Sequence, residues 1–229
     1  MVRLENLTKI YRVSGDKRVI ADRINGVFPT GRSVALMGRN GAGKSSLLRL
    51  IAGTEAPTSG RIVSDGSISW PVGFGGSFHV DMTGAQNVRF IARIYGVDTD
   101  TLLDFVADFA ELGSHFHLPF RTYSSGMRSR LGFGLSMGIH FDTYLVDEVT
   151  AVGDAAFKMR SKDLFLERLS TSSAIFVSHS MQQLRDICDM GAIIEDGQLH
   201  FYEDVDEAIA RYNELLGVKV TALPPKKKP

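Results

Sequence analysis

Residues Gly38–Ser45, GRNGAGKS, decide how the rest of this chain is interpreted. They fit the pattern G-x-x-x-x-G-K-[ST]. An apolar run, SVALM at Ser33–Met37, precedes them, and LLRLIAG, with apolar residues at helical spacing, follows. A strand, a glycine-rich loop and a helix are therefore predicted in succession. Such a loop points backbone N–H groups inward beside the positive end of a helix, which favours bound phosphate. A glycine-rich turn without a ligand is the alternative, and the flanking strand and helix disfavour it.

The end of this loop carries side chains suited to phosphate and metal binding. Lys44 is expected to reach the β- and γ-phosphates of a nucleotide. The hydroxyl of Ser45 is placed to coordinate Mg²⁺, and Ser46 is a further candidate contact.

A second apolar run, YLVDE at Tyr144–Glu148, ends in two carboxylates. The carboxyl ends of strands in an open parallel sheet form the edge where ligands bind. We expect Asp147 to hold the magnesium ion, mostly through water, and Glu148 to accept a proton from the attacking water. An acidic strand end that only begins a loop is common for an isolated pair, but the phosphate loop disfavours that interpretation.

Two shorter segments are weaker candidates when taken alone. TYSSGMRSR, Thr122–Arg130, places small hydroxyl residues and a glycine at the start of a predicted helix, which suits either an anion site or a simple N-cap. IFVSHS places His179 at the end of another apolar strand, where it could donate to a γ-phosphate oxygen. A lone histidine there is more often structural.

Composition narrows the class of protein without naming a partner. The 229 residues carry 26 Lys plus Arg and 26 Asp plus Glu, and 44% are hydrophobic. This balance argues against a disordered chain and against a nucleic-acid-binding protein, so no nucleic-acid partner is expected. The one cysteine, Cys188, excludes an internal disulfide. No secretion signal and no membrane-crossing segment are predicted.

The order of predicted elements is that of an α/β protein. Two half-buried strands, Val2–Leu7 and about Arg18–Phe28, suggest an antiparallel edge before the glycine loop. A helical stretch covers about Thr83 to His140, and strands and helices alternate after it. A hairpin is predicted to turn at Asp196-Gly197, followed by a helix at about Val205–Leu216.

Together, these segments resemble the nucleotide-binding subunit of ABC transporters, and the resemblance covers almost the whole chain. It implies a P-loop NTPase fold with a RecA-like core sheet, an N-terminal antiparallel β-subdomain and an inserted α-helical subdomain at about 83–140. The nucleotide-binding domain would span 1–218, and 219–229 would form a C-terminal tail.

The resemblance also assigns roles by position. Tyr11 matches the aromatic A-loop residue that stacks on adenine, Asp154 matches the D-loop, and His179 matches the switch histidine, which together with Lys44 and Glu148 gives the catalytic set. The ATP-binding set is then Tyr11, Gly38, Arg39, Asn40, Gly41, Ala42, Gly43, Lys44, Ser45 and Ser46, and the metal set is Ser45 and Asp147. Ser124, Ser125, Gly126 and Met127 stand where the family has its LSGGQ signature, which completes the site of the opposite subunit.

Longer strings, such as SISWPVGF and TYSSGMRSRLGFGLSM, resemble the ATPase subunit of bacterial capsular polysaccharide exporters. The chain departs from the superfamily pattern at three positions. His79 stands at the Q-loop glutamine, as it does in relatives that export O-antigen or teichoic acid, Met127 replaces the signature glutamine, and Val149 replaces the usual proline.

The leading hypothesis is therefore an ATPase that binds ATP and Mg²⁺ and powers export of lipid-linked capsular polysaccharide. The resemblance implies three kinds of partner: a second copy of the chain, an integral-membrane permease, and periplasmic or outer-membrane capsule export proteins. It implies a peripheral location on the cytoplasmic face of the bacterial inner membrane. The alternatives are the same ATPase exporting O-antigen, teichoic acid or another substrate, and a soluble ABC protein with no transporter. A P-loop kinase or GTPase leaves YSSGM and His179 without a role.

Overall fold

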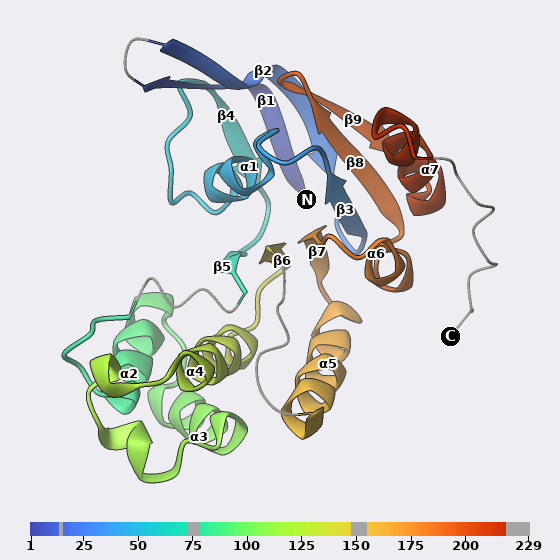
Figure 1. Ribbon diagram of the computed structural model, residues 1–229. Helices are drawn as coiled ribbons and strands as arrows, with labels where there is room; N and C mark the ends of the chain where they lie inside the picture. Colours follow the sequence, from blue (N-terminus) through green and yellow to red (C-terminus); the bar gives the residue numbers. More distant parts are fainter. Residues whose placement is uncertain (14–15, 73–77, 148–154, 219–229) are drawn as a thin grey trace. The chain divides into compact units, whose positions relative to one another are not determined.

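The computed structural model of the protein describes residues 1–13, 16–72, 78–147 and 155–218. These residues belong to two compact units (Figure 1). The first, here called the sheet unit, falls within Met1–Pro71, Phe141–Glu148 and Thr171–Pro229. The second, the helical unit, falls within Val72–His140 and Val149–Ser170.

A six-stranded sheet forms the centre of the sheet unit, with the strand order β5-β6-β7-β3-β8-β9. All its neighbouring strands are parallel except the final antiparallel pair. The strands are β3 (Ser33–Met37), β5 (Ile68–Pro71), β6 (Thr143–Asp147), β7 (Ser173–Val177), β8 (Met190–Glu195) and β9 (Gln198–Tyr202). Every residue of β3 and β7 is buried, as expected for central strands covered on both faces. The α/β fold class predicted from the alternation of elements is confirmed.

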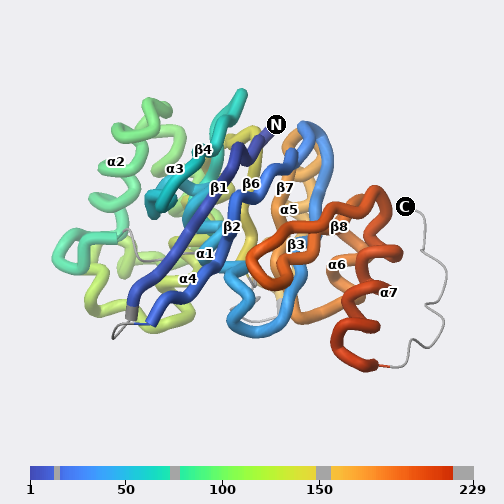
Figure 2. Tube along the Cα trace, turned by 90° about the horizontal axis from the view of Figure 1, so that it is seen from above, coloured from blue at the N-terminus to red at the C-terminus, as the bar shows by residue number. Residues whose placement is uncertain are grey.

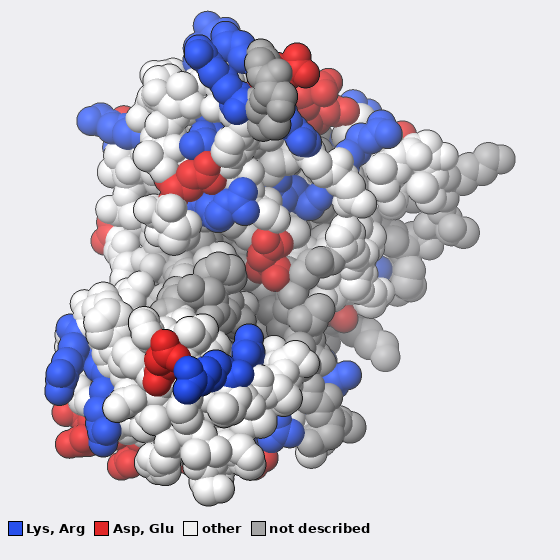
Figure 3. All heavy atoms as spheres, turned by 60° about the vertical axis from the view of Figure 1, so that its left-hand side comes forward, with Lys and Arg blue, Asp and Glu red and all other residues white. Residues whose placement is uncertain are grey.

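A second, antiparallel sheet has the order β2-β1-β4. Its strands are β1 (Val2–Val13), β2 (Asp16–Phe28) and β4 (Ser59–Ser64). The predicted N-terminal pair is present, although β1 runs six residues beyond Leu7. Strand β4 was not predicted, because none of its residues is fully buried and it lacks the apolar alternation of a half-buried strand. Lys and Arg side chains gather at the end of the β1–β2 hairpin (Figure 3), where Arg12 lies opposite Lys17.

Helix α1 (Lys44–Ile51) packs between the two sheets. Its residues Leu47, Leu48, Leu50 and Ile51 are buried in one core with side chains from β1, β2, β3, β6, β7 and β8. Because four of its eight side chains lie in that core, the helix and the loop before it are fixed by apolar packing.

Two later helices complete the sheet unit, α6 (Met181–Ile187) and α7 (Val205–Leu215). The buried Arg185 of α6 forms an ion pair with Asp206 of α7 over 2.6 Å. Helix α7 lies beside β8 (Figure 2). The contact is so close that a Cβ at Gly191 of β8 would overlap the Cβ of Ala208. The predicted hairpin is also present, with positive φ at both Asp196 and Gly197.

The helical unit contains α2 (Gly84–Tyr95), α3 (Thr99–Ala110), α4 (Ser125–Gly138) and α5 (Ala155–Leu169), with short 3₁₀ helices at Gly113–His117 and Phe120–Thr122. A capping box between Thr83 and Gln86 begins α2. Gly134 and Gly138 allow α4 to approach α3 closely, because a side chain at Gly138 would meet Leu102 and Phe105. Among the described residues, no helix is long and apolar enough to cross a bilayer.

Candidate functional site

Three neighbouring parallel strands of the central sheet end at one edge and carry the predicted site residues there. The strands β6, β7 and β3 are adjacent in the sheet. Strand β6 ends at Asp147, β7 is followed by His179, and β3 leads into the glycine loop at Gly38. Asp147 is paired in register with Val177 of β7, and His179 follows Val177 by two residues. The carboxylate and the histidine therefore lie at the same end of two neighbouring strands. This is the carboxyl edge at which open α/β sheets bind ligands.

The glycine loop has a backbone that side chains would disrupt at two points. Gly43, the residue before α1, has φ +111°, and a Cβ there would overlap the Ile20 side chain. Gly38 has φ +156°, and a Cβ would lie 2.6 Å from the carbonyl oxygen of Ile194. The sequence prediction of a tight, glycine-dependent turn between a strand and a helix is therefore confirmed by the geometry.

The Lys44 side chain folds back over the loop that precedes it. Its Nζ donates to the carbonyl oxygen of Gly38 over 2.7 Å and to that of Arg39 over 3.2 Å. The amide of Ala42 donates to the same Arg39 carbonyl over 3.0 Å. The ammonium group is thus bound to two carbonyl oxygens of the loop, and a phosphate can take their place.

Tyr212 of α7 contacts the same loop at the carbonyl of Gly38. Its hydroxyl donates to the Gly38 carbonyl over 3.0 Å, so this buried oxygen accepts from both Lys44 and Tyr212. Burial raises the pKa of Tyr212 above its ordinary value, while the charge of Arg39 lowers it. The phenol therefore remains a donor at neutral pH. The contact joins residues 174 positions apart, and no local sequence pattern predicts it.

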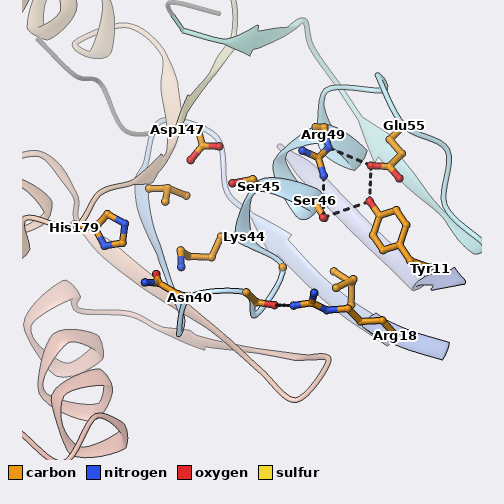
Figure 4. Close-up of a pocket in the computed structure, with 14 residues that line it drawn as sticks. Tyr11, Arg18, Asn40, Lys44, Ser45, Ser46, Arg49, Glu55, Asp147 and His179 are labelled. Atoms are coloured by element: carbon orange, nitrogen blue, oxygen red, sulfur yellow. Dashed lines mark hydrogen bonds and ion pairs between the residues drawn. The ribbon is translucent and has the colours of Figure 1, made fainter. Parts of the chain in front are cut away.

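A group of polar side chains surrounds Tyr11 at the other end of the site (Figure 4). We call Lys9, Tyr11, Ser46, Arg49 and Glu55 the Tyr11 cluster. The Tyr11 hydroxyl donates to Glu55 Oε2 over 2.7 Å and is hydrogen-bonded to Ser46 Oγ over 3.3 Å. Lys9 Nζ lies 2.8 Å from Glu55 Oε1, and Arg49 Nε lies 3.2 Å from Glu55 Oε2. Hydrogen bonds from Lys9, Tyr11 and Arg49 lower the pKa of Glu55 to about 2.

Residues of the glycine loop, of the ends of β6 and β7 and of the Tyr11 cluster, Lys9 excepted, line one cavity of about 670 Å³, a size suited to a small-molecule ligand. Figure 4 shows Lys44, Ser45, Asp147 and His179 grouped at one end and Tyr11 with Glu55 at the other. Of the predicted residues, the cavity brings together Tyr11, Asn40, Gly41, Gly43, Lys44, Ser45, Ser46, Asp147 and His179. Gly38, Arg39 and Ala42 belong to the same loop but are not among the lining residues.

Sequence reasoning missed five lining residues: Arg18, Ile20, Arg49, Glu55 and Val177. Arg18 lies opposite Tyr11 in the β1–β2 register and donates to the Gly41 carbonyl over 2.6 Å. A correct register for the hairpin would have found it. Arg49 lies four residues after Ser45 on α1, so helical spacing would have indicated it. Glu55 follows the helix in a loop and gives no such signal.

Three predicted positions, Glu148, Val149 and Asp154, lie outside the described residues. The assignments of Glu148 as general base and of Asp154 to the D-loop therefore stay predictions.

The signature-like residues begin helix α4 in the helical unit. Ser124 is the N-cap and accepts a hydrogen bond from the amide of Met127. Ser125 is exposed, and Gly126 and Met127 are partly exposed. The nearest atom to a Cβ at Gly126 would be Ser124 Oγ at 3.9 Å. Ser124 thus caps the helix, as the N-cap interpretation predicts, and among the described residues this helix start is at least partly exposed.

His79, at the predicted Q-loop position, is exposed and is held by a buried asparagine of α2. The His79 amide donates to Asn87 Oδ1 over 2.8 Å, and Asn87 Nδ2 donates to the carbonyl of His79 over 3.1 Å. Asn87 Nδ2 also donates to the carbonyl of Thr83 over 3.0 Å. The imidazole Nδ1 accepts from the amide of Asp81 over 3.3 Å.

Comparison with known proteins decides the family. The ABC transporter family matches residues 21–151, more than half of the chain. The polysialic acid transport ATP-binding protein KpsT of Escherichia coli is 48% identical over 93% of this chain and 99% of that protein. The chain belongs to the ABC transporter family. It is an ABC-type ATPase.

Two other relatives are less similar in sequence, and one solved structure shares the fold. The capsule polysaccharide export ATP-binding protein CtrD of Neisseria meningitidis is 43% identical over 94% of this chain and 100% of its own length. The O-antigen export system ATP-binding protein RfbB of Klebsiella pneumoniae is 33% identical over 89% of this chain and 85% of its own. The dimeric ABC cassette MJ0796, solved with ADP and phosphate, has the same fold with a TM-score of 0.74 at 20% identity, covering 90% of this chain and 99% of that one.

Proposed function

We propose that this ABC ATPase hydrolyses Mg-ATP between two copies of itself and thereby drives export of a capsular polysaccharide through a separate membrane permease. The observation that carries the cargo assignment is the similarity to transporters of polysialic acid and capsule polysaccharide, at 43–49% identity over nearly whole chains. The lower identity of the O-antigen relative makes O-antigen export the second candidate. The proposal includes a nucleotide-binding domain at 1–218 with a helical insertion at about 83–140.

The cavity supports the assignment of its two ends to the two parts of ATP. Backbone amides of the glycine loop and the start of α1 suit the phosphates, and the ring of Tyr11 suits the adenine base. Ser45 and Asp147 both line the cavity and offer the oxygen ligands that Mg²⁺ prefers. The ion, when bound, would neutralise charge on the β- and γ-phosphates.

Within the chain, each candidate residue has a defined task in this proposal. Lys44 exchanges its carbonyl contacts for phosphate oxygens. His179 hydrogen-bonds the γ-phosphate, from a position fixed by Ser178 and Ser180 on either side of it, which hydrogen-bond to each other and to Gln183. Glu148 accepts the proton of the attacking water.

The second copy supplies its helix α4. The exposed N-terminus, with Ser125 and Gly126, offers amide donors to the phosphates bound by the first copy. Each site would then be complete only in the dimer, and ATP would join the two copies until hydrolysis releases them.

The permease partner finds support in helix α2. Phe90 and Ile94 lie one helical turn apart on α2 and are 51% and 59% exposed, and the neighbouring Tyr95 is 43% exposed. A group of exposed apolar side chains on one helix is a surface that a protein partner can cover. We assign it to the cytoplasmic surface of the membrane subunit, which would place the protein peripherally at the inner membrane, where periplasmic and outer-membrane capsule export proteins would complete the system.

The test of the ATPase proposal uses the protein purified with its neighbouring permease. Glu148→Gln should bind Mg-ATP and accumulate as an ATP-bound dimer with little turnover. Unchanged hydrolysis would remove Glu148 as the base.

The test of the cargo uses the source bacterium with Lys44→Ala in the chromosomal copy. Loss of extracellular capsule with an intact O-antigen ladder is the expected result. Loss of the O-antigen ladder with normal capsule would establish the second candidate instead.

A further inference from the structure

The Tyr11 cluster contains more hydrogen bonds and ion pairs than are needed for a ring that only stacks on a base. An exposed tyrosine could present its ring to a base without any partner for its hydroxyl. Here the hydroxyl donates to Glu55, and Glu55 also accepts from Lys9 and Arg49. Only 22% of the Glu55 side chain and 13% of the Lys9 side chain are exposed, so this ion pair is mostly buried.

We propose that Glu55 is a positioning residue that fixes the ring of Tyr11 and thereby sets the affinity for the adenine base separately from the affinity for the phosphates. This inference deepens the proposed function, because it rests on Tyr11 as the base-stacking residue.

The ring is held at two places. Its hydroxyl is bound to Glu55 at 2.7 Å, and the Lys9 ammonium lies over its face, 5.0 Å from the ring centroid. Glu55 also binds that ammonium, so one carboxylate fixes both contacts. Because Lys9 covers one face of the ring, a base stacks on the other. Removal of Glu55 would take a partner from both groups, leaving the hydroxyl with Ser46 and the ammonium with the Ala56 carbonyl.

The phosphate end does not depend on this carboxylate. Helix α1, which carries Lys44 and Ser45, is anchored by its buried leucines and isoleucine in the core between the sheets. The glycine loop is fixed by contacts with Arg18, Ile20 and Tyr212. Glu55 does not contact Arg18, Ile20 or Tyr212, and its side chain meets α1 at the exposed Arg49, one turn beyond Ser45. Its loss should therefore leave the phosphate contacts of Lys44 and Ser45 intact.

The experiment compares two probes by calorimetry on the full chain, Mg-ATP and Mg-tripolyphosphate, which has no base. Glu55→Ala is expected to raise the Kd for ATP about fivefold, a part of what full loss of a base–aromatic stack costs, and to leave the Kd for tripolyphosphate unchanged. Tyr11→Phe, which keeps the ring and removes the hydroxyl, should have the same pattern. Since Glu55→Ala already removes the hydroxyl's contact with the carboxylate, adding Tyr11→Phe to it should raise the Kd for ATP little further. If Glu55→Ala fails to fold, Glu55→Gln and Tyr11→Phe carry the same comparison.

Glu5→Ala is the matched control, because Glu5 forms ion pairs with Arg3 and Arg61 on the same antiparallel sheet and does not line the cavity. It should leave both probes unchanged. An equal change for both probes in Glu55→Ala, or no change for either, would overturn the inference.

Failure of the proposed function would give different binding results. The unaltered protein would then not bind Mg-ATP, or Tyr11→Ala would bind it as tightly as the unaltered protein does. In the second case the Glu55 inference is overturned as well.

Discussion

Tyr212→Phe tests whether helix α7 supports nucleotide binding through the Gly38 carbonyl. Without nucleotide, this carbonyl accepts from Lys44 and from Tyr212. When Lys44 turns to a phosphate, Tyr212 keeps the buried oxygen paired. The variant would lose that contact at the moment when Lys44 leaves, so the cost falls on the nucleotide-bound state.

The magnitude follows from the burial of the two groups. An unpaired buried acceptor costs about 1–3 kcal/mol. Tyr212 is half-buried, so water can reach the gap and the lower end applies. About 1 kcal/mol corresponds to a Kd for Mg-ATP raised about fivefold. Without nucleotide, Lys44 still satisfies the carbonyl, and the free energy of unfolding should fall by only about 0.5 kcal/mol.

Calorimetry with Mg-ATP and urea unfolding without nucleotide measure the two quantities. Tyr202→Phe is the control, because Tyr202 lies on β9 and does not line the cavity. A variant that loses more than about 1 kcal/mol of unfolding free energy while binding ATP normally would refute the reasoning, since the hydrogen bond would then be purely structural.

Three further predictions concern the same units. The Glu55 carboxyl has an ordinary pKa of 4.5 and a folded pKa of about 2, so its stabilising contribution is present above about pH 4.5 and is lost as the pH falls through about 2. Screening at this partly exposed site limits the contribution to about 1 kcal/mol, and Glu55→Gln should therefore flatten acid unfolding followed by circular dichroism in that window. Gly126→Asp should fold, since its Cβ position is open, yet fail to dimerise with ATP in gel filtration, and normal ATP-driven dimers would contradict the composite site. Gly43→Ala should destabilise more than Gly53→Ala by about 1–3 kcal/mol in urea unfolding, because both have positive φ but only Gly43 would also meet Ile20; equal losses would show that the overlap relaxes freely.

The parts of the site that the sequence predicted are those that follow from local pattern. The glycine loop sits between a strand and a helix, and Asp147 and His179 end buried strands, so their meeting at one sheet edge follows from parallel topology. The role of Tyr11 was predicted only from the family resemblance, because a single aromatic residue in a strand does not by itself indicate base stacking.

The parts that the sequence did not predict depend on register and packing. Arg18 faces the cavity only because it lies opposite Tyr11 in the hairpin. Glu55 reaches Lys9 and Tyr11 from a loop 44 to 46 positions away, and Tyr212 reaches Gly38 across 174 positions. Strand β4 was missed because its pairing with β1 is made by backbone groups, with side chains that are mostly exposed.

The close approach of α7 to β8 at Gly191 extends the set of residues on which nucleotide affinity depends. A side chain at Gly191 would push against Ala208, one turn before Tyr212 on the same helix. Displacement of that helix would withdraw the hydroxyl from the Gly38 carbonyl, although Gly191 itself does not line the cavity. In a saturation mutagenesis screen for export, substitutions at Gly191 should therefore reduce export as substitutions at the glycines of the phosphate loop do. Mutagenesis limited to the residues that line the cavity would not include this position.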